Sequence, residues 1–264
     1  MVSFLDVDED LLFPDSDGQP MADNTEQYEW IVKIKENLEI IFINNPQVFI
    51  AGDLLWYPLK STLVAPVAPD VMVAFGRPKG KRGSYRQWRE ENIPPQVVFE
   101  ILSPNNTKAE MTRKLEFYNI YGVEEYYLYN PKKLRFQGWQ RETKKLTEII
   151  PINNWISPRL GIRFVVDSSG LEIYRPDGQK FLTSIELDNQ VQQERQRAET
   201  EKLKAQAERQ RAETEKLKAQ AERQRAETEK LKAEKQKLKA DKQKRRADIL
   251  AQRLRELGVN LEEE

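Results

Sequence analysis

The chain of 264 residues carries 43 Lys and Arg against 43 Asp and Glu, and it contains neither cysteine nor histidine. These counts exclude disulfides, cysteine nucleophiles, Ser-His triads and metal sites built on thiolate or imidazole. Any metal site must be rich in oxygen ligands, which suits Mg²⁺ or Mn²⁺. No apolar run approaches the roughly 20 residues of a membrane span, and the acidic N-terminus lacks the basic start of a signal peptide. A cytoplasmic protein with no membrane partner is therefore expected.

Four segments follow one another along the chain. Residues 1–22 are typical of a flexible leader, 23–185 of a globular domain, 186–257 of a long charged helix, and 258–264 of an acidic tail. The balanced total hides an asymmetry, because residues 191–264 carry 21 basic and 16 acidic side chains. The first 190 residues are correspondingly acidic, which does not favour nucleic-acid binding on bulk charge.

The globular segment is predicted to begin with a helix near Asp23, where Glu26 could complete a capping box. A second helix is expected over 106–121, ended by Gly122. Apolar runs predict strands at 47–51, 54–57, 71–75, 97–102, 125–130, 134–140, 145–150, 162–166 and 171–175. Strands interrupted by a helix predict an α/β fold of the α+β type, with helices packed on a mixed sheet.

A 14-residue repeat fills the helical segment. ERQRAETEKLKAQA occupies 194–207, recurs at 208–221 and begins again at 222. The best coiled-coil seam runs through Thr200, Leu203, Ala207 and Gln210 and repeats from Thr214, but only every second d position is Leu. A self-associating coiled coil and a solitary charged helix are both compatible with this pattern. The basic stretch 230–246 could contact nucleic acid or be a solvated helix face.

Two carboxylates stand out in the globular segment. Glu100 lies inside the apolar run 97–102, where a charge is costly unless it is paired or bound to a metal. Asp70 follows Pro69 and opens the apolar run 71–75. Carboxylates on neighbouring strands can hold Mg²⁺ for phosphodiester hydrolysis, with a lysine beside them. The alternatives are a strand-starting role for Asp70 and a structural ion pair for Glu100.

The lysine is not where the PD-(D/E)XK nuclease pattern has it. Pro69-Asp70 matches the opening of that pattern, but Leu102 stands two residues after Glu100. The nearest lysines are Lys108 and Lys114 on the following helix. Lys114 borders the predicted apolar stripe, so its side chain could reach back to the carboxylates.

Five stretches together resemble the Uma-type restriction endonuclease family of the PD-(D/E)XK superfamily: AGDLLWYP (51–58), APDVMVAFGRPKGKRGSYRQW (68–88), PPQVVFEILSPNN (94–106), KLEFYNIYGVEEYYLYNP (114–131) and SPRLGIRF (157–164). The resemblance covers about 28–185. It implies a restriction-endonuclease-like core for 23–185, Asp70 and Glu100 as metal ligands, and Lys114 as the lysine migrated onto the helix. The family often has Asp at the position of Glu110.

Further side chains are candidates for supporting roles. Asp53 and Glu110 could be auxiliary acids, and Glu36 or Glu39 on the first helix could point inward. The loop 76–92 interleaves cations with aromatic side chains and could hold phosphates and stack a base. Its candidate nucleic-acid contacts are Lys81, Arg82, Tyr85, Arg86 and Trp88.

The first functional hypothesis is a Mg²⁺- or Mn²⁺-dependent endonuclease acting on DNA, with Asp70, Glu100 and Lys114 as catalytic residues. Its helical tail would form a homodimer or recruit a partner protein. The alternative is a catalytically idle nuclease-like scaffold that works as an interaction protein through a C-terminal coiled coil. A third reading is a nucleic-acid binder that uses 230–246.

Overall fold

The computed structural model describes residues 9–18 and 21–257 and divides the chain into two compact units, Met1–Asn189 and Gln190–Glu264. The expected acidic tail at 258–264 lies outside the described residues, as do residues 1–8 and 19–20 of the expected leader.

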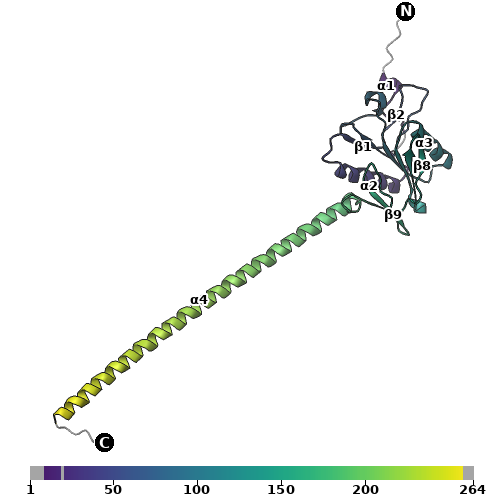
Figure 1. Cartoon of the computed structure of the whole chain (residues 1–264). Coiled ribbons are helices and arrows are strands. Elements are labelled where there is room, and N and C mark those ends of the chain that lie inside the picture. The colour runs from purple at the N-terminus through teal and green to yellow at the C-terminus, as the bar shows by residue number, and fades with distance from the viewer. Residues whose placement is uncertain (1–8, 19–20, 258–264) are drawn as a thin grey trace, which may run out of the picture. The chain divides into compact units, whose positions relative to one another are not determined.

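A six-stranded sheet forms the centre of the first unit (Figure 1). In spatial order its strands are β1 (Val48–Gly52), β3 (Val71–Phe75), β5 (Val97–Ile101), β6 (Glu125–Asn130), β7 (Arg135–Glu142) and β8 (Lys145–Glu148). β5 and β6 run parallel, and the other neighbouring pairs are antiparallel. This mixed sheet confirms the predicted α/β architecture.

Helices cover both faces of the sheet. α2 (Thr25–Ile41) and the hairpin of β9 (Arg163–Asp167) with β10 (Gly170–Tyr174) bury one face, and α3 (Lys108–Ile120) packs on the other. Along β5, Phe99 and Ile101 enter the first core and Val98 enters the second. Because side chains alternate along a strand, Glu100 also faces α3.

The start of α2 differs from the expected capping box. Asn24 is the N-cap, and its side chain accepts a hydrogen bond from the Gln27 amide at 2.9 Å. The helix begins at Thr25, close to the start predicted near Asp23, but its cap is Asn24. The C-terminal prediction for α3 is confirmed, because Gly122 follows the cap with a φ of +95° that suits glycine.

Short elements complete the first unit. β2 (Trp56–Tyr57) and β4 (Tyr85–Arg86) form a small parallel pair, and two 3₁₀ turns occupy Gln87–Arg89 and Pro131–Lys133. Within the expected leader, α1 (Glu9–Leu12) precedes Phe13, which is buried against Tyr57 and Leu55. Packing of Phe13 thus fixes a segment that the sequence pattern did not predict to be structured.

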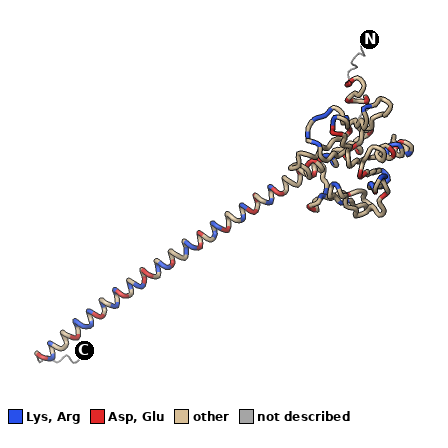
Figure 2. Tube along the Cα trace, turned by 45° about the horizontal axis from the view of Figure 1, so that its top comes forward, with Lys and Arg blue, Asp and Glu red and all other residues tan. Residues whose placement is uncertain are grey.

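The predicted long helix is present as α4 (Ser184–Glu256). Its 73 residues extend about 110 Å at 1.5 Å per residue. Basic and acidic residues are interspersed along much of it, and the stretch 230–246 is mainly basic (Figure 2). No helix among the described residues is both long and apolar enough to cross a membrane.

Candidate active site

Asp70 and Glu100 meet on neighbouring strands. β3 and β5 are antiparallel with Val71 opposite Phe99, and continuing this register by one residue puts Asp70 opposite Glu100. Only 7% of Asp70 and 3% of Glu100 is exposed. The sheet therefore brings together two carboxylates that the sequence separates by 30 residues, at a place with little access to solvent.

Helix α3 supplies partners for both oxygens of Glu100. The Lys114 ammonium lies 2.8 Å from Glu100 Oε2, and the Tyr118 hydroxyl donates to Oε1. Lys114 and Tyr118 are four residues apart, so they share one face of the helix. Lys114 thus reaches the carboxylates from the helix, the geometry on which the sequence-based site depends.

Asp70 is held by donors from two other elements. The Ile101 amide donates to Asp70 Oδ2 at 2.6 Å, and the Gln27 side-chain nitrogen lies 3.4 Å from both carboxylate oxygens. The same Gln27 nitrogen donates to the Ile101 carbonyl at 3.0 Å. The Gln27 side-chain nitrogen therefore lies near three oxygens at the end of β5, the two carboxylate oxygens of Asp70 and the Ile101 carbonyl.

Electrostatics distinguish the two acids. Burial, followed by the negative charge of Glu100, raises the pKa of Asp70 to about 8, against the opposing effect of Lys114. Burial alone would lower the pKa of Lys114, but the charges of Glu100 and Asp70 outweigh it and raise that pKa. One ammonium thus faces two buried carboxyl groups, and it balances only one of them when both are ionised.

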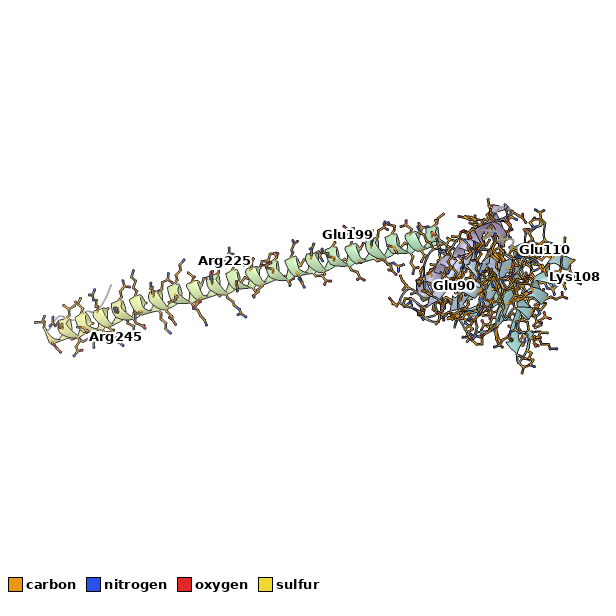
Figure 3. The ribbon with its side chains drawn as sticks, turned by 90° about the horizontal axis from the view of Figure 1, so that it is seen from above. Glu90, Lys108, Glu110, Glu199, Arg225 and Arg245 are labelled. Carbon is orange, nitrogen blue, oxygen red and sulfur yellow. The ribbon has the colours of Figure 1, made fainter. Side chains whose placement is uncertain are left out.

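The two expected auxiliary acids occupy different positions. The backbone amide of Asp53 donates to the carbonyls of Pro69 and Asp70, at 3.1 and 3.2 Å. Burial, with smaller contributions from Asp17 and Glu100, raises the pKa of Asp53 to about 6. Glu110 instead closes a capping box with Thr107 at the start of α3, where Figure 3 labels it beside Lys108. Asp53 borders the carboxylate pair, whereas Glu110 stabilises the helix that carries Lys114.

Acids on α2 do not reach the pair in the described structure. Glu39 accepts a hydrogen bond from Lys79 at 2.7 Å, and Glu36 accepts one from Ser184 at 2.7 Å. Gln27, at the opposite end of the same helix, contacts Asp70 instead. Sequence reasoning missed Gln27, and its only signal was a position in the first turn of a helix expected beside the sheet.

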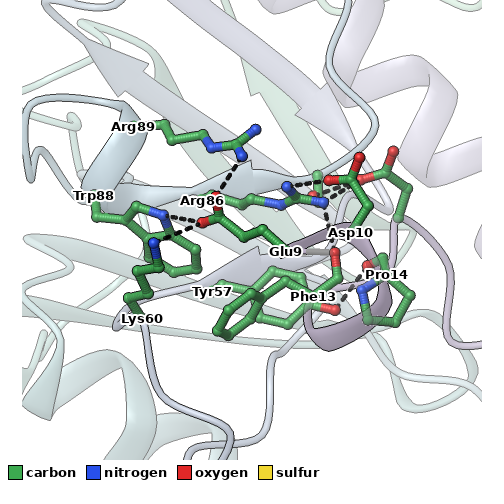
Figure 4. A network of polar contacts seen from close by, with 11 residues as sticks. Glu9, Asp10, Phe13, Pro14, Tyr57, Lys60, Arg86, Trp88 and Arg89 are labelled. Atoms are coloured by element: carbon green, nitrogen blue, oxygen red, sulfur yellow. Dashed lines mark hydrogen bonds and ion pairs between the residues drawn. The ribbon is translucent and has the colours of Figure 1, made fainter. Parts of the chain in front are cut away.

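The cationic and aromatic loop is engaged with the protein itself (Figure 4). Arg86 donates to Asp10 at 2.5 Å and to the Phe13 carbonyl at 2.6 Å, and the Trp88 indole donates to Glu9 at 2.8 Å. Of the other candidates, Arg82 pairs with Glu90, Tyr85 donates from its buried ring to the Ile93 carbonyl, and Lys81 is exposed. The contacts of Arg86 and Trp88 hold α1 and the residue after it against the loop.

The carboxylate oxygens of Asp70 and Glu100 are suitable ligands for a hard divalent cation, but two carboxylates are few for such a site. Among residues 9–18 and 21–257, no group of three or more acidic side chains is placed to hold a metal. A cation at Asp70 and Glu100 would need further oxygens, and Mg²⁺ commonly takes these from water and substrate phosphates. A cavity of about 500 Å³ between α3 and the sheet, lined by Leu102 and Leu115 among others, includes neither carboxylate nor Lys114.

Glu125 shows what a structural buried carboxylate looks like in the same sheet. It is 1% exposed, and its oxygens accept hydrogen bonds from Ser157, from Tyr127 at 2.9 Å and from the Arg159 amide at 2.8 Å. Its partners are neutral donors, and burial raises its pKa. The Asp70–Glu100 pair differs because two carboxylates share one lysine.

A family model described as "Uma2: Putative restriction endonuclease" matches residues 32–166, about half of the chain. No curated protein matches it. Among solved structures, the chain is similar to one titled a "putative nuclease belonging to DUF820 from Anabaena variabilis ATCC 29413", with 13% identity, a TM-score of 0.40, and coverage of 53% of this chain and 74% of that chain.

Proposed function

The chain belongs to the Uma2 family of restriction-endonuclease-like proteins, and from this premise we propose that it is a metal-dependent endonuclease that hydrolyses phosphodiester bonds in DNA. The observation that carries the proposal is the contact of 2.8 Å between the Lys114 ammonium and Glu100, beside Asp70. Asp70, Glu100 and Lys114 together supply two carboxylates and one cationic donor, which are the groups that phosphodiester hydrolysis requires.

Asp70 and Glu100 would hold Mg²⁺ or Mn²⁺. A bound divalent cation supplies a water of lowered pKa and stabilises negative charge on phosphate oxygens. When Asp70 is ionised, two buried carboxylates share the single ammonium of Lys114, and a bound cation would balance the second negative charge, which supports this assignment. Asp53, close enough for its pKa to respond to Glu100, is the auxiliary acid of the proposal.

The protein's own residues have distinct tasks. Lys114 donates a hydrogen bond and positive charge where an attacking water or a phosphate oxygen would lie. Tyr118 fixes the orientation of Glu100 through its hydroxyl. Gln27 restrains Asp70 and the Ile101 carbonyl, so α2 helps to position the carboxylates.

A cleavage assay on supercoiled and linear DNA, with Mg²⁺ or Mn²⁺, tests the proposal. We expect activity in the wild-type protein and its loss in Asp70→Asn, Glu100→Gln and Lys114→Met. The matched control is Lys108→Met, which removes a lysine from the exposed start of the same helix. An inactive wild type on varied DNA, or full activity in Asp70→Asn and Glu100→Gln, contradicts the proposal.

A metal-binding measurement gives a readout without turnover. Mg²⁺ or Mn²⁺ that binds only the folded state raises its unfolding temperature. We expect this rise in the wild-type protein and not in Asp70→Asn.

A second candidate function is an idle nuclease-like scaffold that acts through the helical tail. Leu102 at the usual lysine position and the complete pairing of both Glu100 oxygens favour it. This scaffold would show neither cleavage nor metal-dependent stabilisation, and its working part would be α4, through a second copy or a partner protein.

A further inference from the structure

The repeat segment of α4 has an apolar seam that a single chain leaves uncovered. Leu203, Leu217 and Leu231 recur every 14 residues, and they are 60%, 61% and 54% exposed. In heptad notation they occupy d positions, and the a positions between them alternate Thr and Ala. From residue 200 to 231, the a and d positions contain no charged side chain.

The threonines of the seam do not bring an unpaired hydroxyl into it. Thr200, Thr214 and Thr228 each donate to the backbone carbonyl four residues earlier, at 2.8, 2.8 and 2.7 Å. Their hydroxyl groups are thereby satisfied within the helix. The Thr methyl groups remain available for packing against a partner helix.

The positions beside the seam carry charge of opposite sign on its two sides. The e positions are all basic and the g positions are acidic or Gln. The e positions are Lys204, Arg211, Lys218, Arg225 and Lys232, and the g positions are Glu199, Gln206, Glu213, Gln220 and Glu227. Figure 3 labels one side chain of each kind, Glu199 and Arg225.

This arrangement discriminates between orientations. In a parallel coiled coil a g residue faces the e residue five positions later on the partner, so Glu199 meets Lys204 and Glu213 meets Lys218 of the second copy. In an antiparallel pair, g faces g and e faces e, which brings acid against acid and base against base. The parallel pair is attractive at every such charged contact, and the antiparallel pair is repulsive.

The 14-residue period also sets the register. Aligned copies form Leu–Leu layers at 203, 217 and 231, and Gln–Gln layers at 210 and 224. A shift of one heptad places Leu against Gln at 203, 210, 217 and 224 and keeps only Leu231 against Leu238, and a shift of two heptads sets Leu231 against Arg245. After residue 234 the seam receives Lys235, Lys242 and Arg245, so charges end the favourable pairing there.

We propose that residues 199–232 pair with the same residues of a second copy of this chain, as a parallel, in-register coiled coil. The partner is identified by charge complementarity across the seam and by the exposed leucines. The proposal is independent of nuclease activity and holds equally for an active enzyme and for a scaffold.

The absence of cysteine from the natural chain permits a direct test of orientation. In full-length Leu203→Cys the new thiols of a parallel, in-register pair face each other and form an intermolecular disulfide on mild oxidation. Ala205→Cys, at the outward f position of the same heptad, is the matched control. We expect roughly tenfold more cross-linked dimer for Leu203→Cys. Equal cross-linking of both variants overturns the proposal, as does cross-linking that occurs only in a mixture of Leu203→Cys and Leu231→Cys.

A charge-reversal pair tests the recognition itself. The sequence Glu-Thr-Glu places one glutamate of each repeat at g (199, 213, 227) and another at b (201, 215, 229). Replacing the three g glutamates by Lys should weaken the dimer roughly a hundredfold in sedimentation equilibrium. The same replacement at b changes net charge equally but lies outside the seam, so dimerisation should persist. A wild-type protein that remains monomeric at micromolar concentration, or equal effects of the two triple variants, overturns the proposal.

Discussion

Lys114→Met separates the ion pair of the candidate site from the hydrophobic packing around it. Methionine keeps the straight side chain but removes the ammonium, so Glu100 loses its charged partner while 3% exposed. Removing one member of a buried pair costs about 3 to 5 kcal/mol. Because Lys114 is 20% exposed and Tyr118 still donates to Glu100, we expect the lower end, about 3 kcal/mol.

Urea unfolding followed by tryptophan fluorescence measures this loss. All five tryptophans (30, 56, 88, 139 and 155) lie in the first unit, so the signal reports on that unit and not on α4. With a denaturant slope of about 2 kcal/mol per molar urea, the midpoint should fall by about 1.5 M. Lys108→Met, on the exposed first turn of α3, should change stability by less than about 0.5 kcal/mol.

The double variant Glu100→Gln with Lys114→Met decides whether the loss belongs to the pair. If the two side chains interact as described, the double variant should be more stable than the sum of the single effects by about 2 kcal/mol. Additive effects, or equal midpoints for Lys114→Met and Lys108→Met, would refute the reasoning.

Three further predictions concern the same unit. The pKa of Asp70 is raised from 3.8 to about 8 in the folded protein, so the metal-free folded state binds a proton more tightly than the unfolded chain does. The free energy of unfolding should therefore fall as pH rises from about 4 to about 8. In a chelator, the stability advantage of Asp70→Asn over wild type should grow across this range in urea unfolding, and a constant difference would contradict the assignment. Tyr118→Phe removes one hydroxyl donor from Glu100 and should cost about 1 to 2 kcal/mol by the same method, against no loss if that bond does not form. Phe13→Ala removes the ring that packs against Tyr57 and should make the chain near Pro14 more sensitive to limited proteolysis. Unchanged cleavage would show that Phe13 does not anchor this segment.

Much of the sheet could be predicted from local sequence. The segments predicted at 71–75 and 125–130 coincide with β3 and β6, because both strands are buried and have an apolar or aromatic run, over 71–75 and 126–129. The approach of Lys114 to Glu100 also followed from a local argument, since helical periodicity put Lys114 at the edge of the packed face. α1 was missed because four residues are too few to show periodicity.

Contacts between distant segments could not be predicted in this way. Gln27 meets Asp70 across 43 residues only because the first turn of α2 lies at the ends of β3 and β5. The cations of the loop read as possible phosphate contacts, but Arg86 is 76 residues from its partner Asp10 in the chain. Such pairings depend on how elements pack, and no local pattern encodes them.

Placing the lysine on α3 rather than on β5 makes the candidate site sensitive to local unfolding. A strand lysine leaves its position only when the sheet opens, whereas α3 is a single helix of 13 residues whose first turn is held by the Thr107–Glu110 capping box. Fraying of α3 would withdraw Lys114 and Tyr118 from Glu100 together, while the six strands stay paired. We therefore expect the amide protons of α3 to exchange with solvent sooner than those of β5, and site integrity to follow the exchange of the helix.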